Sequence, residues 1–172
     1  GIFGTYLLPN NHSDPEIRLK QLLDAIKLVF ASIYSDNSRT YFEAINYKIE
    51  QEKMAVVIQS VVGNRYGDAY YPHISGTAQS FNFYPVSYMS PQDGFAVVAL
   101  GLGQYVLDGE RAFRFSPAYP SLDIVSIEDI SSYAQADFYA VNMARSEVDL
   151  LQGENAGLIK LDISRAEADG TL

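Results

Sequence analysis

Apolar side chains recur every three or four residues between positions 19 and 33, and this spacing constrains the fold more than any other feature of the chain. The stripe consists of Leu19, Leu22, Leu23, Ile26, Val29, Phe30 and Ile33. On an α-helix these side chains share one face. The preceding SDPE segment offers Ser13 as an N-cap, Pro15 in the first turn and Glu16 to complete a capping box. The pattern predicts a helix of about 20 residues with one apolar stripe.

Strand-type runs lie on both sides of this helix. Residues 2–8 predict a strand, and residues 54–62 (MAVVIQSVV) predict one that is buried on both faces. A shorter helix is predicted over 38–47. The remaining predicted strands are one long or two short strands within 66–85, then 95–101, 111–115, 136–143 and 157–164. A helical pair followed by such strands predicts an α+β fold with mostly antiparallel pairing.

Composition excludes several classes of function. The chain has 172 residues, a formal net charge of −9 and no cysteine. A negative field repels polyanions, so neither nucleic acid nor an anionic membrane is expected as a partner. Without cysteine there are no disulfides and no thiolate metal sites, which favours a cytoplasmic location. The opening GIFGTYLLPN lacks the features of a secretory signal and starts inside a predicted strand, so we expect a piece of a longer chain.

Candidate chemistry centres on Gly101-Leu102-Gly103, which separates two apolar runs. Glycines at a strand end permit positive φ or a close approach of another group to the backbone. The segment is neither a P-loop nor a complete dinucleotide fingerprint. Spacing alone therefore favours a tight bend over a phosphate site. His12 and His73 lie far apart without carboxylates at ligand spacing, so no metal site is expected on them.

Four segments follow one another in an order that resembles a known family. They are AIKLVFASIYSDNSRTY (25–41), EKMAVVIQSVVG (52–63), HISGTAQS (73–80) and ALGLGQYVLDG (99–109). Together they are similar to the nucleotide-binding region of phosphoenolpyruvate synthase and pyruvate phosphate dikinase. The resemblance covers residues 1–117 and implies the second lobe of an ATP-grasp domain, with packed helices and a mostly antiparallel sheet. Residues 118–172 are then a continuation of it or the start of an adjoining segment.

The resemblance implies an activity for the longer protein. Enzymes of this family transfer the β-phosphoryl group of ATP to a histidine on a swivelling domain, and from there to pyruvate in a barrel domain. ATP and Mg²⁺ are thus the implied cofactors, and pyruvate or phosphoenolpyruvate is the partner of further domains. The phosphohistidine and pyruvate-binding segments are missing from these 172 residues, so the isolated chain is expected to be inactive.

The resemblance also implies a set of nucleotide-binding residues. They are Gln59, Ser60, Val61 and Val62 beside the adenine, Gly101 and Gly103 at the cleft, and Gln104. The family also has a second polar metal ligand on the strand after Gly109, where this chain has Arg111 and Arg114 instead. Either these arginines bind phosphate oxygens directly, or the site has lost its original chemistry. Gln104 stands where the family carries a glutamate that contacts ATP and metal. A carboxamide is a weaker Mg²⁺ ligand than a carboxylate, so a metal role for Gln104 is doubtful. The alternative for both arginines is an exposed strand face.

Two other functions stay open at this point. The first is a non-catalytic or regulatory relative that binds nucleotide without turnover, which the glutamine at position 104 favours. The second is a structural or interaction domain that binds no nucleotide.

Overall fold

The computed structural model describes residues 2–110, 112–120 and 134–172. The chain divides into two compact units. Unit 1 comprises residues 1–61, 67–69 and 141–159, and unit 2 comprises residues 62–66, 70–140 and 160–172.

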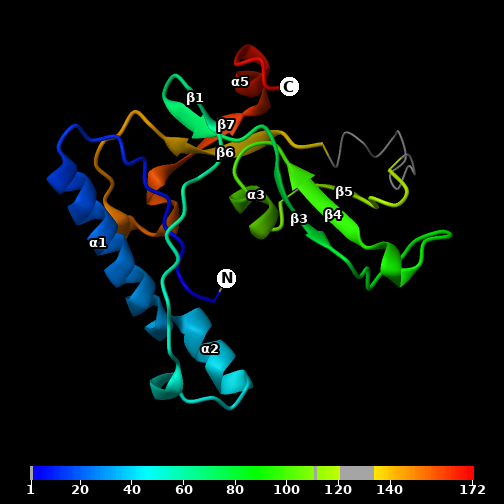
Figure 1. Ribbon diagram of the computed structural model, residues 1–172, viewed down its shortest axis with the longest axis horizontal. Coiled ribbons are helices and arrows are strands. Elements are labelled where there is room, and N and C mark those ends of the chain that lie inside the picture. Colours follow the sequence, from blue (N-terminus) through cyan, green and yellow to red (C-terminus); the bar gives the residue numbers. More distant parts are fainter. Residues whose placement is uncertain (1, 111, 121–133) are drawn as a thin grey trace. The chain divides into compact units, whose positions relative to one another are not determined.

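Two helices dominate unit 1. The predicted helix is confirmed as α1 (Pro15–Ala31), although Leu19, Leu23 and Phe30 of its apolar stripe are exposed. A 3₁₀ turn (Ser32–Tyr34) leads from it to α2 (Asp36–Ala44), the shorter helix (Figure 1). The N-cap of α1 is Asp14 and not Ser13, because the Asp14 carboxylate accepts a hydrogen bond from the Glu16 amide at 2.9 Å. A capping carboxylate directly before a proline at the first helical position satisfies a free N–H and complements the helix dipole.

Two serines fasten the first residues of the chain to these helices. The Ser32 hydroxyl accepts a hydrogen bond from the Gly4 amide at 2.8 Å. The Ser38 hydroxyl is fully buried and lies 2.8 Å from the carbonyl oxygen of Ile2. Side chains and not a β-ladder therefore hold residues 2–8, and the strand predicted there is wrong.

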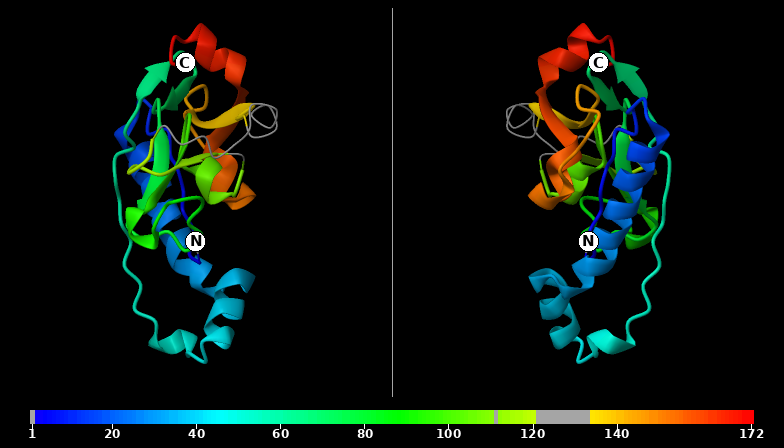
Figure 2. Two further views of the ribbon diagram at one scale, coloured as in Figure 1. Left: turned by 90° about the vertical axis from the view of Figure 1, so that its right-hand side faces the viewer. Right: turned by 90° about the vertical axis from the view of Figure 1, so that its left-hand side faces the viewer.

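The buried strand predicted over 54–62 is also wrong. Residues 52–63 belong to no helix or strand, and Figure 2 draws them as an extended tube between α2 and β1. Val57, Ile58 and Val62 are 76%, 61% and 84% exposed. An apolar run predicts burial only where neighbouring strands complete its ladder. Both sheets of the described chain are built from other segments.

A three-stranded sheet lies wholly within unit 2. Its order is β3 (Ser75–Gln79), β4 (Phe95–Ala99) and β5 (Phe113–Phe115), with both pairs antiparallel. Ser75 lies opposite Ala99, and Arg114 lies opposite Val97. These strands confirm the predictions over 95–101 and 111–115, with shorter ends. β3 carries Gly76 because a Cβ there would overlap the carbonyl oxygen of Val97.

A four-stranded sheet has the order β1-β2-β6-β7. Its strands are β1 (Asn64–Tyr66), β2 (Ala69–Tyr71), β6 (Asp137–Asn142) and β7 (Leu158–Asp162). The predictions over 136–143 and 157–164 are thus confirmed. The region 66–85 contributes to three short strands, because a turn with positive φ at Gly67 and then Pro72 interrupt it. The α+β class with antiparallel pairing is confirmed.

Short helices complete the chain. The sequence pattern missed α3 (Gln104–Leu107) and α5 (Ile163–Ala168). Four 3₁₀ turns also occur, at Ile49–Gln51, Pro91–Asp93, Leu150–Gln152 and Glu154–Gly157. In unit 2 the ring centroids of Tyr71 and Phe138 lie 4.7 Å apart, and both residues are fully buried.

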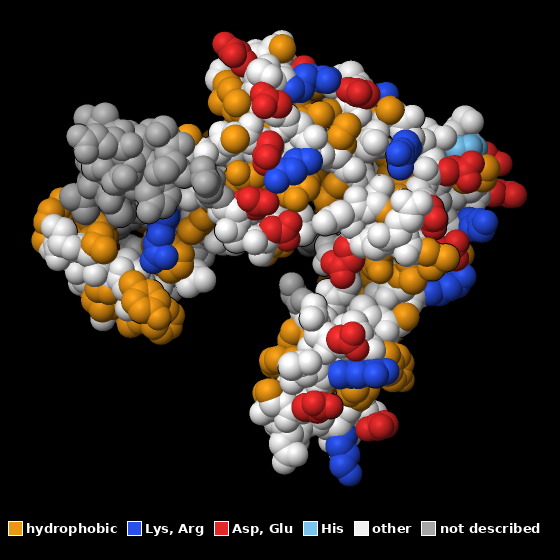
Figure 3. Space-filling view, turned by 180° about the vertical axis from the view of Figure 1, so that it is seen from behind, with side chains coloured by type: hydrophobic (Ala, Val, Ile, Leu, Met, Phe, Trp, Pro, Cys, Tyr) orange, Lys and Arg blue, Asp and Glu red, His pale blue; other side chains and the backbone are white. Residues whose placement is uncertain are grey.

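The distribution of charged side chains on the surface is consistent with the net negative charge of the sequence. On the face drawn in Figure 3, Lys and Arg side chains lie scattered among Asp and Glu side chains and do not gather into a basic patch. Within the described part of the chain, no helix has the length and apolar character that a membrane span requires.

Candidate functional site

The bend that follows β4 is held by neighbouring parts of unit 2. The Gln135 carboxamide bonds both backbone groups of Leu100, accepting from its amide at 2.9 Å and donating to its carbonyl at 3.0 Å. The Ser75 hydroxyl donates to the Gly101 carbonyl at 2.6 Å, and the Leu102 amide donates to the Tyr139 carbonyl at 2.9 Å. These backbone groups already form hydrogen bonds within the protein, so a ligand at the bend must bind to other backbone or side-chain groups.

The two glycines of the bend have different surroundings. Gly101 is buried with φ +80°, and a Cβ there would lie 2.7 Å from the Tyr139 carbonyl oxygen and 2.8 Å from Cδ2 of Phe138. Its identity is therefore explained by backbone conformation and by close packing on β6. Gly103 is half-buried, and a Cβ there would meet only Cβ of Ser75, at 3.8 Å. Gly103 is the more open of the two to a ligand.

Gln104 begins α3 and is paired with an acid one turn later. Its Nε2 donates to Oδ1 of Asp108 at 2.7 Å. Residues four apart on a helix face one another, so this spacing was the available signal for the pair, although the sequence analysis did not use it. The bend thus presents a carboxamide and a carboxylate side by side.

Lys160 forms a charged cluster beside α3. Its Nζ lies 3.1 Å from Asp137 Oδ1 and 3.3 Å from Glu110 Oε1, and 5.4 Å from the ring centroid of Tyr139. The hydrogen bond to Asp137, reinforced by Glu110, raises the pKa of Lys160, so the ammonium stays charged at physiological pH. This cation from β7 therefore links the segment after α3 to the start of β6.

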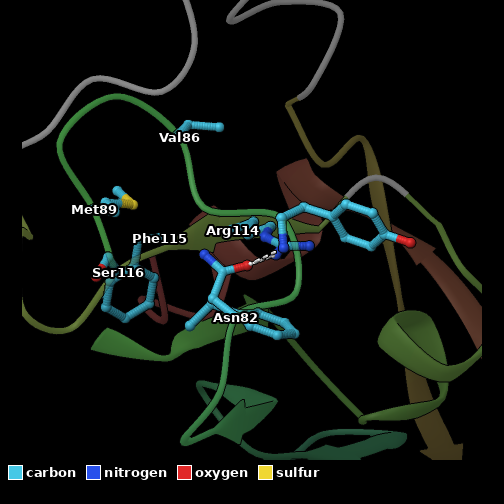
Figure 4. Close-up of a pocket in the computed structure, with 8 residues that line it drawn as sticks. Asn82, Val86, Met89, Arg114, Phe115 and Ser116 are labelled. Atoms are coloured by element: carbon cyan, nitrogen blue, oxygen red, sulfur yellow. Dashed lines mark hydrogen bonds between the residues drawn. The ribbon is translucent and has the colours of Figure 1, made fainter. Parts of the chain in front are cut away.

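Arg114 lies in a different part of unit 2. Its Nη2 donates to Oδ1 of Asn82 at 2.9 Å, and its guanidinium carbon stacks 3.9 Å from the centroid of the Phe95 ring. Figure 4 shows Asn82 and Arg114 pointing toward one another at a small cavity. Phe95 begins β4, whereas Gly101 follows its end, so the structure does not bring Arg114 to the bend.

The remaining predicted residues lie elsewhere. Gln59, Ser60 and Val61 belong to unit 1, on the exposed extended segment, and Val62 begins the part assigned to unit 2. Arg111 lies outside the described residues. In the described ranges no group of three or more His, Cys, Asp or Glu side chains is arranged to hold a metal ion. The roles that the resemblance implies for these residues stay predictions.

Comparison with known families decides what kind of domain carries this bend. A family model described as "Pyruvate phosphate dikinase, AMP/ATP-binding domain" matches residues 1–150. The chain belongs to this family. The match includes all four segments named above, so the resemblance to phosphoenolpyruvate synthase and pyruvate phosphate dikinase is confirmed. The α+β architecture is consistent with an ATP-grasp-like domain. No curated protein and no solved structure matches the chain.

Proposed function

We propose that this chain is the ATP-binding part of a phosphotransferase that uses ATP to phosphorylate pyruvate, by way of a phosphohistidine carried on another domain. The observation that carries the proposal is the match of an AMP/ATP-binding domain to residues 1–150. Pyruvate or phosphoenolpyruvate would be bound by further domains of the longer protein, and we propose a cytoplasmic location.

The bend after β4 is the proposed phosphate side of the nucleotide site. The open surroundings of Gly103 support this placement, because a phosphate needs close access to backbone amides. Mg²⁺ in such sites is held by one or two carboxylates together with substrate phosphates. Asp108 beside Gln104 supplies one carboxylate and one carboxamide oxygen, so this donor set fits the ion. Residues 59–62 are exposed, and we propose from the family resemblance that they lie beside the adenine.

A second candidate function is nucleotide binding without turnover. The hydrogen bond from the Gln104 amide to Asp108 favours it, because a carboxylate oxygen that already accepts this hydrogen bond is less available to hold a Mg²⁺ ion beside the phosphates. In this case the domain would act as a nucleotide sensor and would not consume ATP.

Calorimetric titration of the full-length protein with ATP, with and without Mg²⁺, tests both functions. The phosphotransferase predicts tighter binding with Mg²⁺ and ATP consumption that depends on pyruvate. The sensor predicts binding that gains nothing from the metal and no pyruvate-dependent turnover. Absence of ATP and AMP binding under all conditions would refute both and leave a structural domain.

A further inference from the structure

Strand β3 forms an edge of the three-stranded sheet in unit 2. It pairs with β4 on one side, and no strand of the described residues lies on its other side (Figure 1). Residues 76–79 of this strand are all exposed. In an antiparallel strand, alternate backbone N–H and C=O groups point away from the neighbouring strand. The outer groups of β3 can therefore form hydrogen bonds with a further strand.

This edge lacks the features that keep exposed strands from pairing with other chains. Natural edge strands are blunted by Lys or other charged side chains, by proline or by a bulge. Residues 74–81, which are β3 and its flanks, read ISGTAQSF and contain neither a charged residue nor a proline. Each residue from Ser75 to Gln79 lies opposite one residue of β4, so no bulge interrupts the strand. The edge is therefore suited to strand addition.

Charge indicates which partner this edge fits. The chain carries 12 Lys and Arg against 21 Asp and Glu, so two copies repel one another over most of their surfaces. Residues 74–81 are uncharged, and two copies can meet there without bringing like charges together. A charged strand of another protein would find no counter-charge on this edge. The edge fits a neutral strand, and the chain itself supplies one.

The sequence of β3 is also complementary to itself when two copies run antiparallel. A two-fold axis at Thr77 places this residue opposite Thr77 of the partner subunit, and Thr–Thr pairs across strands are stabilising. The same register places Ile74 opposite Ser80 of the partner subunit and diagonal to Ala78 of the partner subunit. Ile74 is 71% exposed in the single chain. In the pair, its large side chain meets small ones, so the two strands fit without a clash.

We propose that two copies of this chain associate through β3, in antiparallel pairing about a two-fold axis at Thr77. The pairing joins the two three-stranded sheets into one continuous sheet. Both copies use the same surface, so the assembly closes at two copies and does not grow further. Residues 74–81 include none of the residues proposed at the nucleotide site, so this inference does not rest on the proposed function.

A single introduced cysteine tests the pairing directly, because the chain has no cysteine of its own. Residues opposite one another on antiparallel strands have Cβ atoms about 4.5–5.5 Å apart, close to the separation that a disulfide spans. Thr77→Cys should therefore give a disulfide-linked dimer under mild oxidation, measured on a non-reducing gel. Thr40→Cys, at an exposed position of α2, is the matched control and should stay largely monomeric. Equal cross-linking of the two variants would overturn the proposal.

A charge swap at the same position tests the symmetry of the pair. Sedimentation velocity should show a monomer–dimer equilibrium for the parent protein. Thr77→Lys and Thr77→Glu each place like charges opposite one another, so each should raise the dissociation constant at least about tenfold. An equimolar mixture of the two should restore the dimer, because Lys then faces Glu. Thr40→Lys should leave the parent equilibrium unchanged.

These substitutions change exposed side chains, so the variants should fold, and circular dichroism checks this. Three results of the sedimentation series would overturn the proposal. They are a parent protein that is monomeric at every concentration, a dimer that Thr77→Lys leaves intact, and a mixture of the Lys and Glu variants that stays monomeric.

Discussion

The side-chain amide of Gln104 donates to the carboxylate of Asp108 at 2.7 Å, across one turn of α3. Gln104, a neutral residue, stands where the family resemblance implies a glutamate, and the acid Asp108 lies beside it. A substitution at Gln104 should therefore change both the stability of α3 and the affinity for ATP with Mg²⁺.

Gln104→Glu places two carboxylates four residues apart on a short helix. Like charges at this spacing repel, so we expect the free energy of unfolding without ligand to fall by about 0.2–0.5 kcal/mol. The same change adds a Mg²⁺ ligand, and binding of ATP with Mg²⁺ should become tighter. Chemical denaturation and calorimetry measure the two effects. Unchanged affinity for ATP with Mg²⁺ would show that Gln104 lies away from the nucleotide.

Gly101→Ala should destabilise unit 2 strongly. Alanine at φ +80° costs about 1–2 kcal/mol, and its Cβ would also overlap the Tyr139 carbonyl oxygen and Phe138. Gly109→Ala is the matched control, because Gly109 has φ +73° and nothing within 4 Å of a Cβ. We expect Gly109→Ala to cost only the conformational strain. The difference between the two denaturation midpoints measures the packing at Gly101, and equal midpoints would contradict close packing there.

Lys160→Met should lower the thermal midpoint near neutral pH, because Glu110 and Asp137 lose their shared cation. The loss should shrink at high salt, because dissolved ions screen the attraction between these partly exposed charges. Lys27→Met removes an exposed partner of Asp24 on α1 and should change the midpoint little. A deficit that is the same at low and at high salt would mean that Lys160 contributes packing and not charge.

Because Tyr71 is buried, we expect the protein to lose stability in alkali. Burial, followed by the nearby Asp169, raises the pKa of its phenol above the ordinary value of about 10, although a hydrogen bond with Thr171 opposes this. The pKa of Tyr71 is higher in the folded protein than in the unfolded chain. The contribution of the neutral phenol to the free energy of unfolding is therefore complete below pH 10 and is lost as pH rises from there through the folded-state pKa. Tyr71→Phe removes this ionisation. Its denaturation midpoint should therefore fall less steeply between pH 9 and pH 11 than that of the parent.

The sequence pattern predicted the positions of most helices and strands, but it did not predict which strands pair with one another. The stripe from Leu19 to Ile33 placed α1, since helical periodicity is a local property. Residues 54–62 look like a buried strand by the same kind of reasoning, yet no strand forms there, because pairing depends on distant segments that apolar content does not encode. The helices α3 and α5 span only 4 and 6 residues, too short for a periodicity to be visible.

The candidate site was foreseen in part. The bend at Gly101 was identifiable from two glycines after an apolar run, and the structure confirms a positive φ there. Gln135, which bonds Leu100 at the bend, and Lys160, which bonds Glu110 after α3, were not identifiable, because each is brought to its place by tertiary folding. Arg114 was grouped with the bend because the family resemblance implies a polar ligand on the strand after Gly109. The antiparallel register of β4 and β5 places it opposite Val97 instead.

The family match ends at residue 150, yet the cation shared by Glu110 and Asp137 is contributed by residue 160. A recombinant domain trimmed at the family border would retain both carboxylates without their counter-ion, and β6 would lose its neighbour β7 in the sheet order. Expression boundaries for this domain should therefore be drawn beyond Asp162, where β7 ends, if soluble protein is to be recovered.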